Sequence, residues 1–495
     1  MRQQASVYAR RKREPSLGSR SPRAYMGAGF LFVLVLFLSL PRMGRGDDGA
    51  QPTAAPARPP QTPPARPSAG ANAGAIKGGG SSNSPSASST PTITSVNLEA
   101  ISANPAAVNV VTGTGLLGQT IGLDKIPGVF LGGLWISNGN YLITGGFKPG
   151  RWSFNSLELF DLIIDFDKLA GIPGAQFGVE ALQFNGQPSN EDAGALMGYN
   201  GLEDPKPLDR TQLYELRWRQ SLFHDKLVIR VGKSVPTYDF NNVSMPVPVE
   251  DSSLAIPAVT ALLYTPIFKN PTLIGAMGGY YNSAYGVVLT WAPTQYSYLS
   301  YAVYDGALAT GVQIGLREGP TFNGHYFNIA EAGHAWFLSG WHLPGLMAIG
   351  GWVQTGELYA AGNKENGTGG FYTFGSQRLW RARPGIDNSG VSAFFQFGIN
   401  SSNTMIANEY VGSGLTAFGL IPGRTDDSFG AGIAWSWLNR DLGLRSNEFM
   451  FQTYYQMHLI GATFVEPALS YIPNPGDKPG LPGAVALTSQ ITVLF

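Results

Sequence analysis

The chain has 495 residues with 33 basic and 33 acidic side chains, so its formal net charge is zero. Charged residues make up 13% of the sequence, about half of the usual quarter, while glycine (64 residues) and aromatic residues (12%) are abundant. Because there is no cysteine, the composition excludes a disulfide framework, a cysteine-ligated metal site and a cysteine nucleophile.

The beginning of the chain has the layout of a secretory signal peptide. Basic residues from Arg2 to Arg23 precede an apolar run from Ala24 to Leu40. We expect residues 1–46 to be the signal peptide, with cleavage near Gly46 or Ala50. An uncleaved inner-membrane anchor is the alternative, since the run approaches the roughly 17 residues that can just span a bilayer.

The next part of the chain has little that could form a core. Residues 47–92 are rich in Pro, Ala, Gly and Ser and predict a disordered linker. Residues 93–127 form an N-terminal segment that we expect to be periplasmic or a plug. A GxGxxG match at 113–118 lies in it, but the hairpin-like sequence that follows is not the βαβ unit that a dinucleotide site needs.

From Gly128 onward, strand patterns recur with Gly, Pro and Asn between them. At about 10 residues per membrane strand, plus turns and loops, this length accommodates about 16 strands. The patterns are weakest over 250–269 and 363–384. The predicted strands are 128–137, 140–146, 156–165, 175–184, two within 212–242, 272–281, 284–292, 296–304, 325–331, 335–341, 346–355, 391–400, 428–438, 448–459, 464–471 and 485–495.

Apolar and polar residues alternate along several of these strands. In the hairpin 212–242, Tyr214, Leu216 and Trp218 alternate with Glu215, Arg217 and Arg219, and the late strands 428–438, 449–459 and 485–495 alternate as clearly. A soluble β-sandwich also alternates. The secretory leader and the terminal aromatic strand ending at Phe495 favour an all-β fold in which residues 128–495 form a closed antiparallel transmembrane barrel.

The hairpin also carries a family resemblance. Tyr214-Glu215-Leu216, Asp225, Ile229-Arg230-Val231-Gly232-Lys233 and Asp239-Phe240-Asn241, with GLDKIPGVFLGGLWISNGNYLITGG before them, resemble the OprB-type carbohydrate-selective porins. The resemblance extends from Gly113 to the C-terminus and is dense up to Asn242. It implies a 16-stranded barrel in the bacterial outer membrane that passes mono- or oligosaccharides by passive diffusion.

This assignment implies a channel rather than an enzyme, with no catalytic residue, cofactor or metal. The expected partners are sugars, outer-membrane lipid and the barrel assembly machinery, which would recognise Phe495; no nucleic acid is expected, and the protein would be a monomer or a homo-trimer. A general or anion-selective porin, a secreted glycan-binding β-protein and an outer-membrane hydrolase remain alternatives. The hydrolase lacks support, because neither GxSxG nor HExxH occurs.

Candidate channel residues follow from the alternation. Glu180, Glu215, Arg217, Arg219 and Arg230 are predicted to lie on polar faces of neighbouring strands, with Gln176 and Lys226; Glu158 or Asp161 would join them with Asp165. Trp352 and Tyr454 are candidate lumen aromatics. Carboxylates and guanidiniums together can replace the water hydrogen bonds of sugar hydroxyls. Alternatively, these charges pair with each other and stiffen the wall.

Overall fold

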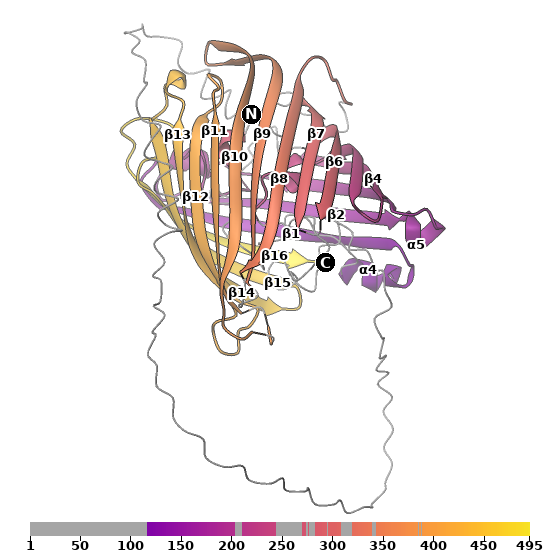
Figure 1. Cartoon of the computed structure of the whole chain (residues 1–495). Helices are drawn as coiled ribbons and strands as arrows, with labels where there is room; N and C mark the ends of the chain where they lie inside the picture. The colour runs from indigo at the N-terminus through magenta and orange to yellow at the C-terminus, as the bar shows by residue number, and fades with distance from the viewer. Residues whose placement is uncertain are drawn as a thin grey trace, which may run out of the picture. The chain divides into compact units, whose positions relative to one another are not determined.

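Sixteen antiparallel strands close into one barrel (Figure 1). The computed structural model describes residues 116–202, 210–243, 270–273, 276, 283–294, 296–307, 319–338, 343–384, 386–387 and 389–495. Each strand pairs with its neighbour in sequence, and β1 pairs with β16. The closed antiparallel barrel and its number of strands are therefore confirmed. The predicted signal peptide, the linker and residues 93–115 lie outside the described residues.

The strands vary in length from eight residues in β5 to 19 in β10. Their bounds are β1 Val129–Thr144, β2 Trp152–Asp165, β3 Ala175–Asn185, β4 Arg210–Leu222, β5 Leu227–Ser234, β6 Ala284–Thr294, β7 Ser297–Asp305, β8 Tyr326–Leu338, β9 Leu343–Ala360, β10 Asn363–Arg381, β11 Gly390–Asn400, β12 Ala407–Phe418, β13 Ser428–Leu438, β14 Asn447–Ile460, β15 Thr463–Ile472 and β16 Ala484–Leu494.

Several strand predictions were wrong in detail. The predicted pairs 128–137 with 140–146 and 325–331 with 335–341 are single strands, β1 and β8. The predicted strand at 272–281 was also wrong in its described part, because Pro271–Leu273 form the 3-10 helix η4. β10 occupies the region of weakest pattern, and β12 was not predicted at all.

The helices of the described residues are short and lie between strands or ahead of the first. They are α4 (Leu116–Thr120), η2 (Leu123–Lys125), α5 (Phe166–Ala170), α6 (Asn190–Ala193), α7 (Pro236–Asp239), η4 and η6 (Arg440–Leu442). None of the helices in the described ranges is long and apolar enough to span a lipid bilayer.

Side chains alternate between the inside and the outside of the barrel as the sequence predicts. On β13, Phe429, Ile433 and Trp435 are 40–42% exposed, whereas Ala434 and Ser436 are 3% and 1% exposed. The exposed residues form the outer surface because successive side chains of a strand point to opposite faces. The outer surface of the barrel is thus largely apolar and aromatic, as a lipid-facing surface must be.

The two ends of the barrel differ in the length of their connections. β1 begins at the end that we call the terminal end, where the turns 223–226, 295–296 and 461–462 are short. The opposite end, which we call the loop end, carries the long connections 186–209, 235–283 and 306–325. Short turns at one end and longer loops at the other are typical of outer-membrane barrels.

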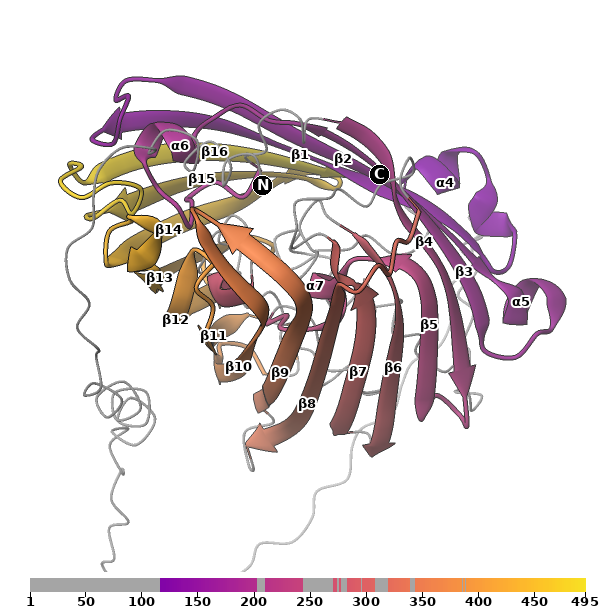
Figure 2. The same cartoon turned by 90° about the horizontal axis from the view of Figure 1, so that it is seen from above.

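The barrel closes where β1 meets β16, which lie side by side in both views (Figures 1 and 2). The register pairs Leu134 with Leu494 and Tyr141 with Leu487. Phe495 continues the pairing, since its N–H donates to Gly133 O at 3.0 Å and its carbonyl accepts from Gly133 N at 2.8 Å. A Cβ on Gly133 would lie 2.5 Å from the Phe495 ring, so this close approach requires glycine.

Part of the barrel interior is an apolar core. Inward-facing Leu134, Leu157 and Leu182 pack with Leu202 and Val235, which belong to connections at the loop end. The interior of an outer-membrane barrel is usually polar. The difference arises because segments of the connections fold into the barrel and bury apolar wall residues against themselves.

Candidate functional site

Two connections from the loop end enter the barrel. The first insert, residues 189–202, contains α6, and the second insert, residues 235–243, contains α7. Seen from above, α7 lies inside the ring of strands (Figure 2). The inserts occupy interior space that the wall alone would leave open, so the residues that hold them determine the shape of the path through the barrel.

The first insert is held at both sides. Buried Glu448 on β14 accepts hydrogen bonds from the backbone N–H groups of Leu196 and Met197, at 2.9 Å each. On the other side, Asn138 Nδ2 of β1 donates to Asn200 Oδ1 at 2.9 Å. A buried carboxylate is tolerated where donors surround it. Glu448 therefore acts as a structural anchor of this insert.

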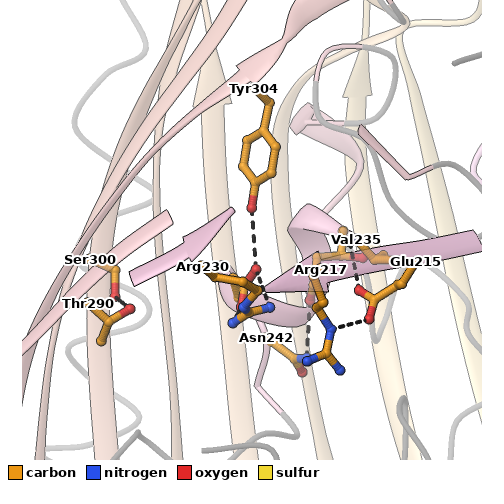
Figure 3. A network of polar contacts seen from close by, with 10 residues as sticks. Glu215, Arg217, Arg230, Val235, Asn242, Thr290, Ser300 and Tyr304 are labelled. Atoms are coloured by element: carbon orange, nitrogen blue, oxygen red, sulfur yellow. Dashed lines mark hydrogen bonds and ion pairs between the residues drawn. The ribbon is translucent and has the colours of Figure 1, made fainter. Parts of the chain in front are cut away.

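The second insert begins against β4 and β5 (Figure 3). Val235 N donates to Glu215 Oε1 at 3.1 Å, while Arg217 Nε donates to Glu215 Oε2 at 2.6 Å. Arg230 of β5 donates two hydrogen bonds to Asp239, and the one from Nη1 to Oδ2 measures 3.0 Å. Burial raises the pKa of Asp239 above its ordinary value, and the Arg230 charge opposes that effect.

The end of the second insert is fixed to a distant strand. Glu331 on β8 accepts from Asn241 N at 2.7 Å and from Tyr372 OH at 2.7 Å. Tyr298 OH donates to the other oxygen of the same carboxylate. The insert therefore extends from β4 and β5 to β8, three strands away in the barrel order. Its two attachments, one at Glu215 and Arg230 and one at Glu331, hold it inside the barrel.

Inward-facing charges form two rows next to the first attachment. Asp161, Glu180 and Glu215 are paired in register on β2, β3 and β4, and they are only 4%, 1% and 1% exposed. Arg219 and Arg230 are paired in the second row, on β4 and β5. Like charges directly opposite each other on neighbouring strands are unfavourable unless something compensates them. Arg217 lies between the rows and compensates Glu215.

Several polar atoms in these rows have no hydrogen-bond partner among the described residues. They are Asp161 Oδ1, Glu180 Oε1, Arg219 Nε and Nη2, and Arg230 Nε. Buried polar groups are normally paired with protein or with water. The wall thus presents acceptors and donors side by side that the described protein does not use.

The five charged residues predicted for the channel are brought together, but the aromatic ones are not. Glu180, Glu215, Arg217, Arg219 and Arg230 all lie in or between the two rows, and each faces inward. Trp352 and Tyr454 also face inward and are 3% and 4% exposed. They lie on β9 and β14, outside the β2–β5 wall.

Two further predictions are settled by the strand register. Lys226 is exposed in the turn between β4 and β5, so the prediction that it lies on the inward polar face was wrong. On β2, Asp161 and Asp165 are buried and face inward, whereas Glu158 belongs to the outward-facing set. The sequence left open whether Glu158 or Asp161 faces inward, because the inward face of β2 also carries the apolar residues Leu157, Leu159 and Ile163, which lie against the apolar core.

Sequence reasoning missed the anchors of the inserts. Asp239 appeared only as part of the family-like motif, and Glu331 and Glu448 were single acidic residues at strand ends or in strands. The sequence feature that could have identified these anchors is a carboxylate on the inward face of a strand that is otherwise apolar or rich in amides. In the described ranges, no group of three or more histidine, aspartate or glutamate side chains is arranged to hold a metal ion.

One family model and one solved structure agree with the fold. The family model described as "Carbohydrate-selective porin, OprB family" matches residues 160–495. The high-pH structure of Pseudomonas putida OprB superposes with a TM-score of 0.66 at 17% identity, covering 78% of this chain and all of that one. Its low-pH structure gives 0.48 at 15% identity over the same shares, and a mutant of Rh. blastica porin gives 0.38 at 9%, covering 74% of this chain and 100% of the other. No curated protein matches.

Proposed function

The chain belongs to the OprB family of carbohydrate-selective porins, and from this membership we propose which part of the barrel its sugars meet. The constriction lies where the second insert crosses from β4 and β5 to β8. Sugars diffuse past the wall formed by Asp161, Glu180, Arg217, Arg219 and Arg230. The protein therefore works as a sugar channel rather than as an enzyme.

The observation that supports this constriction is the set of unpartnered polar atoms. Each sugar hydroxyl can donate one hydrogen bond and accept others, as the hydroxyls of serine and threonine do. The free oxygens of Asp161 and Glu180 accept from such hydroxyls, and the free N–H groups of Arg219 donate to them. Replacing water in this way lets a neutral polyol enter without a large desolvation penalty.

The charges around the path also determine its ion selectivity. Three arginines, Arg217, Arg219 and Arg230, offset inward carboxylates at Asp161, Asp165, Glu180, Glu215 and Asp239. Rings of charged side chains set the selectivity of a pore. The three arginines offset three of these five carboxylates, which keeps the negative excess small and suits a neutral substrate.

The membrane placement follows from the family and the barrel together. Porin membership and a closed barrel imply a bacterial outer-membrane protein. We place the terminal end on the periplasmic side and the loop end outside the cell, because outer-membrane barrels have short periplasmic turns. The strand that ends beside Phe495 would be the part recognised by the assembly machinery.

The test replaces Arg217, Arg219 and Arg230 together by Gln. Single-channel currents of this variant and of the wild type are recorded in planar bilayers. Maltose and glucose are added, and the block of the current and the reversal potential in a salt gradient are measured. Only carboxylates then remain in the rows, so we expect weaker sugar block and a shift of the reversal potential toward cation selectivity.

Two further variants make the result specific. Arg378, which is 1% exposed and lies on β10, provides a matched control as Arg378→Gln. Arg219→Gln alone leaves the ion pairs at Glu215 and Asp239 intact, so it tests the wall without loosening the insert. If Arg219→Gln and the folded triple variant keep the wild-type block and selectivity, the constriction lies elsewhere. A general porin would instead show no sugar block in the wild type.

A further inference from the structure

A row of polar side chains crosses the inner face of the barrel at its closing seam. Gln490 on β16 is opposite Glu466 on β15 and opposite Asn138 on β1. Gln456 on β14 lies on the other side of Glu466, since its Nε2 donates to Glu466 Oε2 at 2.8 Å. The seam row, as we call these four residues, therefore spans β14, β15, β16 and β1, which are neighbours in the ring of strands (Figure 2).

The seam row faces the interior and is sealed from solvent. Gln456, Glu466, Gln490 and Asn138 are 0%, 1%, 3% and 0% exposed, whereas Ile491, which follows Gln490 on β16, is 37% exposed on the outer face. Successive residues of a strand point to opposite faces, so Gln490 and its partners point inward. The Glu466 carboxylate is therefore shielded both from the membrane and from water in the lumen.

The seam row contains more hydrogen-bond acceptors than donors. The amide nitrogen of Gln456 is used on Glu466, and that of Gln490 donates to Thr492 Oγ1 at 3.3 Å. With the nitrogens so placed, the amide oxygens are left over. Four buried oxygens of the row have no hydrogen-bond partner in the part of the chain that the structure describes: Gln456 Oε1, Glu466 Oε1, Gln490 Oε1 and Asn138 Oδ1. Buried acceptors are normally paired, so a group that attracts oxygens belongs among them.

The negative charge of Glu466 has no protein counterpart. None of the ion pairs found in the described ranges includes Glu466. Glu448 on β14 shows how a buried carboxylate is otherwise satisfied, because the backbone N–H groups of Leu196 and Met197 donate to its two oxygens. Among the described residues, Glu466 receives one hydrogen bond only, from a neutral amide. Buried charges are paired or coordinate a metal, since burying an isolated charge is costly.

We propose that Glu466, Gln456 and Gln490 hold a Ca²⁺ ion on the inner face of the barrel. Carboxylate and amide carbonyl oxygens are ligands that Ca²⁺ takes. Residues paired across neighbouring strands have Cβ atoms about 4.5–5.5 Å apart, so both glutamines are within reach of an ion bound to the carboxylate. The ion neutralises the charge of Glu466 and gives the two amide oxygens a partner. The site departs from the expectation, drawn from the sequence, that the protein holds no metal.

The ligand atoms determine which metal the site suits. The seam row has no histidine, and the chain has no cysteine, so the nitrogen and sulfur ligands that zinc and copper prefer are missing. Mg²⁺ demands near-ideal octahedral geometry and usually keeps several waters, for which a sealed site has little room. Ca²⁺ accepts irregular sets of oxygen ligands. Amides and one carboxylate supply them here, so the site differs from the clusters of three acidic or histidine side chains that are absent from the described ranges.

A Ca²⁺ ion in this position would tie together the strands that close the barrel. Glu466 and Gln490 belong to β15 and β16, and Gln490 is paired with Asn138 of β1. The three ligands meet only when β14, β15 and β16 are paired, so the folded barrel alone offers the complete site. A ligand that binds the folded chain and not the unfolded one raises stability by mass action. The inference is independent of which solutes pass through the lumen.

The test is the thermal stability of the full-length protein, refolded in detergent with a chelator so that a sealed ion is removed. Unfolding is followed by tryptophan fluorescence and by heat-modified mobility on gels. After the chelator is removed, Ca²⁺ or Mg²⁺ is added at constant ionic strength, with a sodium salt as the baseline. We expect Ca²⁺ to raise the midpoint of unfolding of the wild type by more than Mg²⁺ does. No shift with Ca²⁺, or equal shifts with the two ions, would overturn the proposal.

Two variants and a control assign the ion to the seam row. Glu466→Gln removes the charge and should abolish the Ca²⁺ shift, while Gln490→Met keeps the length of the side chain without its oxygen and should reduce the shift. Glu448→Gln alters a buried carboxylate whose oxygens already have donors, so its Ca²⁺ shift should equal that of the wild type. If Glu466→Gln does not fold, the calcium that desalted Gln490→Met retains, measured by mass spectrometry, should fall below the wild-type amount. Wild-type Ca²⁺ responses in the folded seam-row variants would overturn the assignment.

Discussion

Replacing Glu331 by Gln should release the far end of the second insert. Glutamine keeps the shape of the side chain, but its amide nitrogen donates instead of accepting. At least one of the three donors, Asn241 N–H, Tyr298 OH or Tyr372 OH, then loses its acceptor. A hydrogen bond to a charged group contributes about 1.5–3 kcal/mol. The population of released insert should therefore rise about 10- to 100-fold.

Single-channel recording and limited proteolysis measure this release. We expect Glu331→Gln to show a larger mean conductance, more frequent current fluctuations and faster cleavage near Asn241, with the barrel still folded. Tyr372→Phe should show the same changes in weaker form, since it removes one donor only. Tyr301→Phe is the control, because Tyr301 OH bonds Asn328 on the outer face at 3.1 Å. Wild-type conductance, noise and cleavage in Glu331→Gln would refute the anchoring role of this carboxylate.

Three other predictions concern the wall, the turns and the leader. Ile491→Arg should lower the free energy of unfolding by about 2–4 kcal/mol, as measured in lipid vesicles, because Ile491 is 37% exposed on the lipid-facing side; unchanged stability would contradict that orientation. Burial alone would raise the pKa of Asp427, but hydrogen bonds from Arg424 and Tyr455 hold it below the ordinary 3.8. The ionised Asp427 therefore stabilises the turn 419–427 above pH 3.8, and this stabilisation is lost as the pH falls through the lowered pKa. Hydrogen exchange in the turn should accelerate over that pH range in the wild type. In Asp427→Asn, exchange in the turn should follow only the intrinsic pH dependence. Mass spectrometry of the native protein should place the mature N-terminus between Gly44 and Gln51, and an intact leader would support the anchor alternative.

Alternation predicted the fold well wherever the outer face was aromatic or aliphatic. It failed in β1, β8, β10 and β12, each of which contains both glycine and asparagine. The sequence Ser137-Asn138-Gly139-Asn140 has the chemistry of a hairpin turn, yet it lies in the middle of β1. Asn138 and Asn140 are tolerated there because they face inward, where Asn200 Oδ1 and Asn155 Oδ1 accept from their amides at 2.9 and 3.0 Å.

The strands missed or judged weak owe their glycines to interior packing. On β12, Gly412 lies against the ring of Tyr410, where a Cβ would come within 2.0 Å of the hydroxyl. On β10, Gly370 leaves room for Trp352, with a Cβ 2.7 Å from the indole nitrogen. Gly412 leaves room for a ring of its own strand, two residues earlier, whereas Gly370 leaves room for a ring of the neighbouring strand β9, which the sequence of β10 alone does not indicate. The predicted number of strands was right because it came from the length of the barrel region; the individual predicted strands numbered seventeen, of which two pairs merged and one was wrong, while β10 and β12 were missed.

The charged site was predictable as a set of residues but not as an assembly. Alternation put Glu215, Arg217 and Arg219 on one face, and their inward orientation follows from the apolar residues between them. The role of Glu215 as a partner of Val235 could not be predicted, because it depends on a connection that folds back into the barrel. Glu331 is more than 80 residues from that connection's first residue, and only the closed ring brings them together.

The seam between β1 and β16 affects the order of events during folding. The register joins Leu134 to Leu494, which are 360 residues apart (494 − 134), so the final ladder has nearly the longest sequence separation that the barrel allows. Contacts of such separation form slowly, because the entropy of closing the loop must be overcome first. Until they form, β1 and the last completed strand are open edges that can pair with other chains. A factor that covers both edges until the seam forms would therefore prevent such pairing.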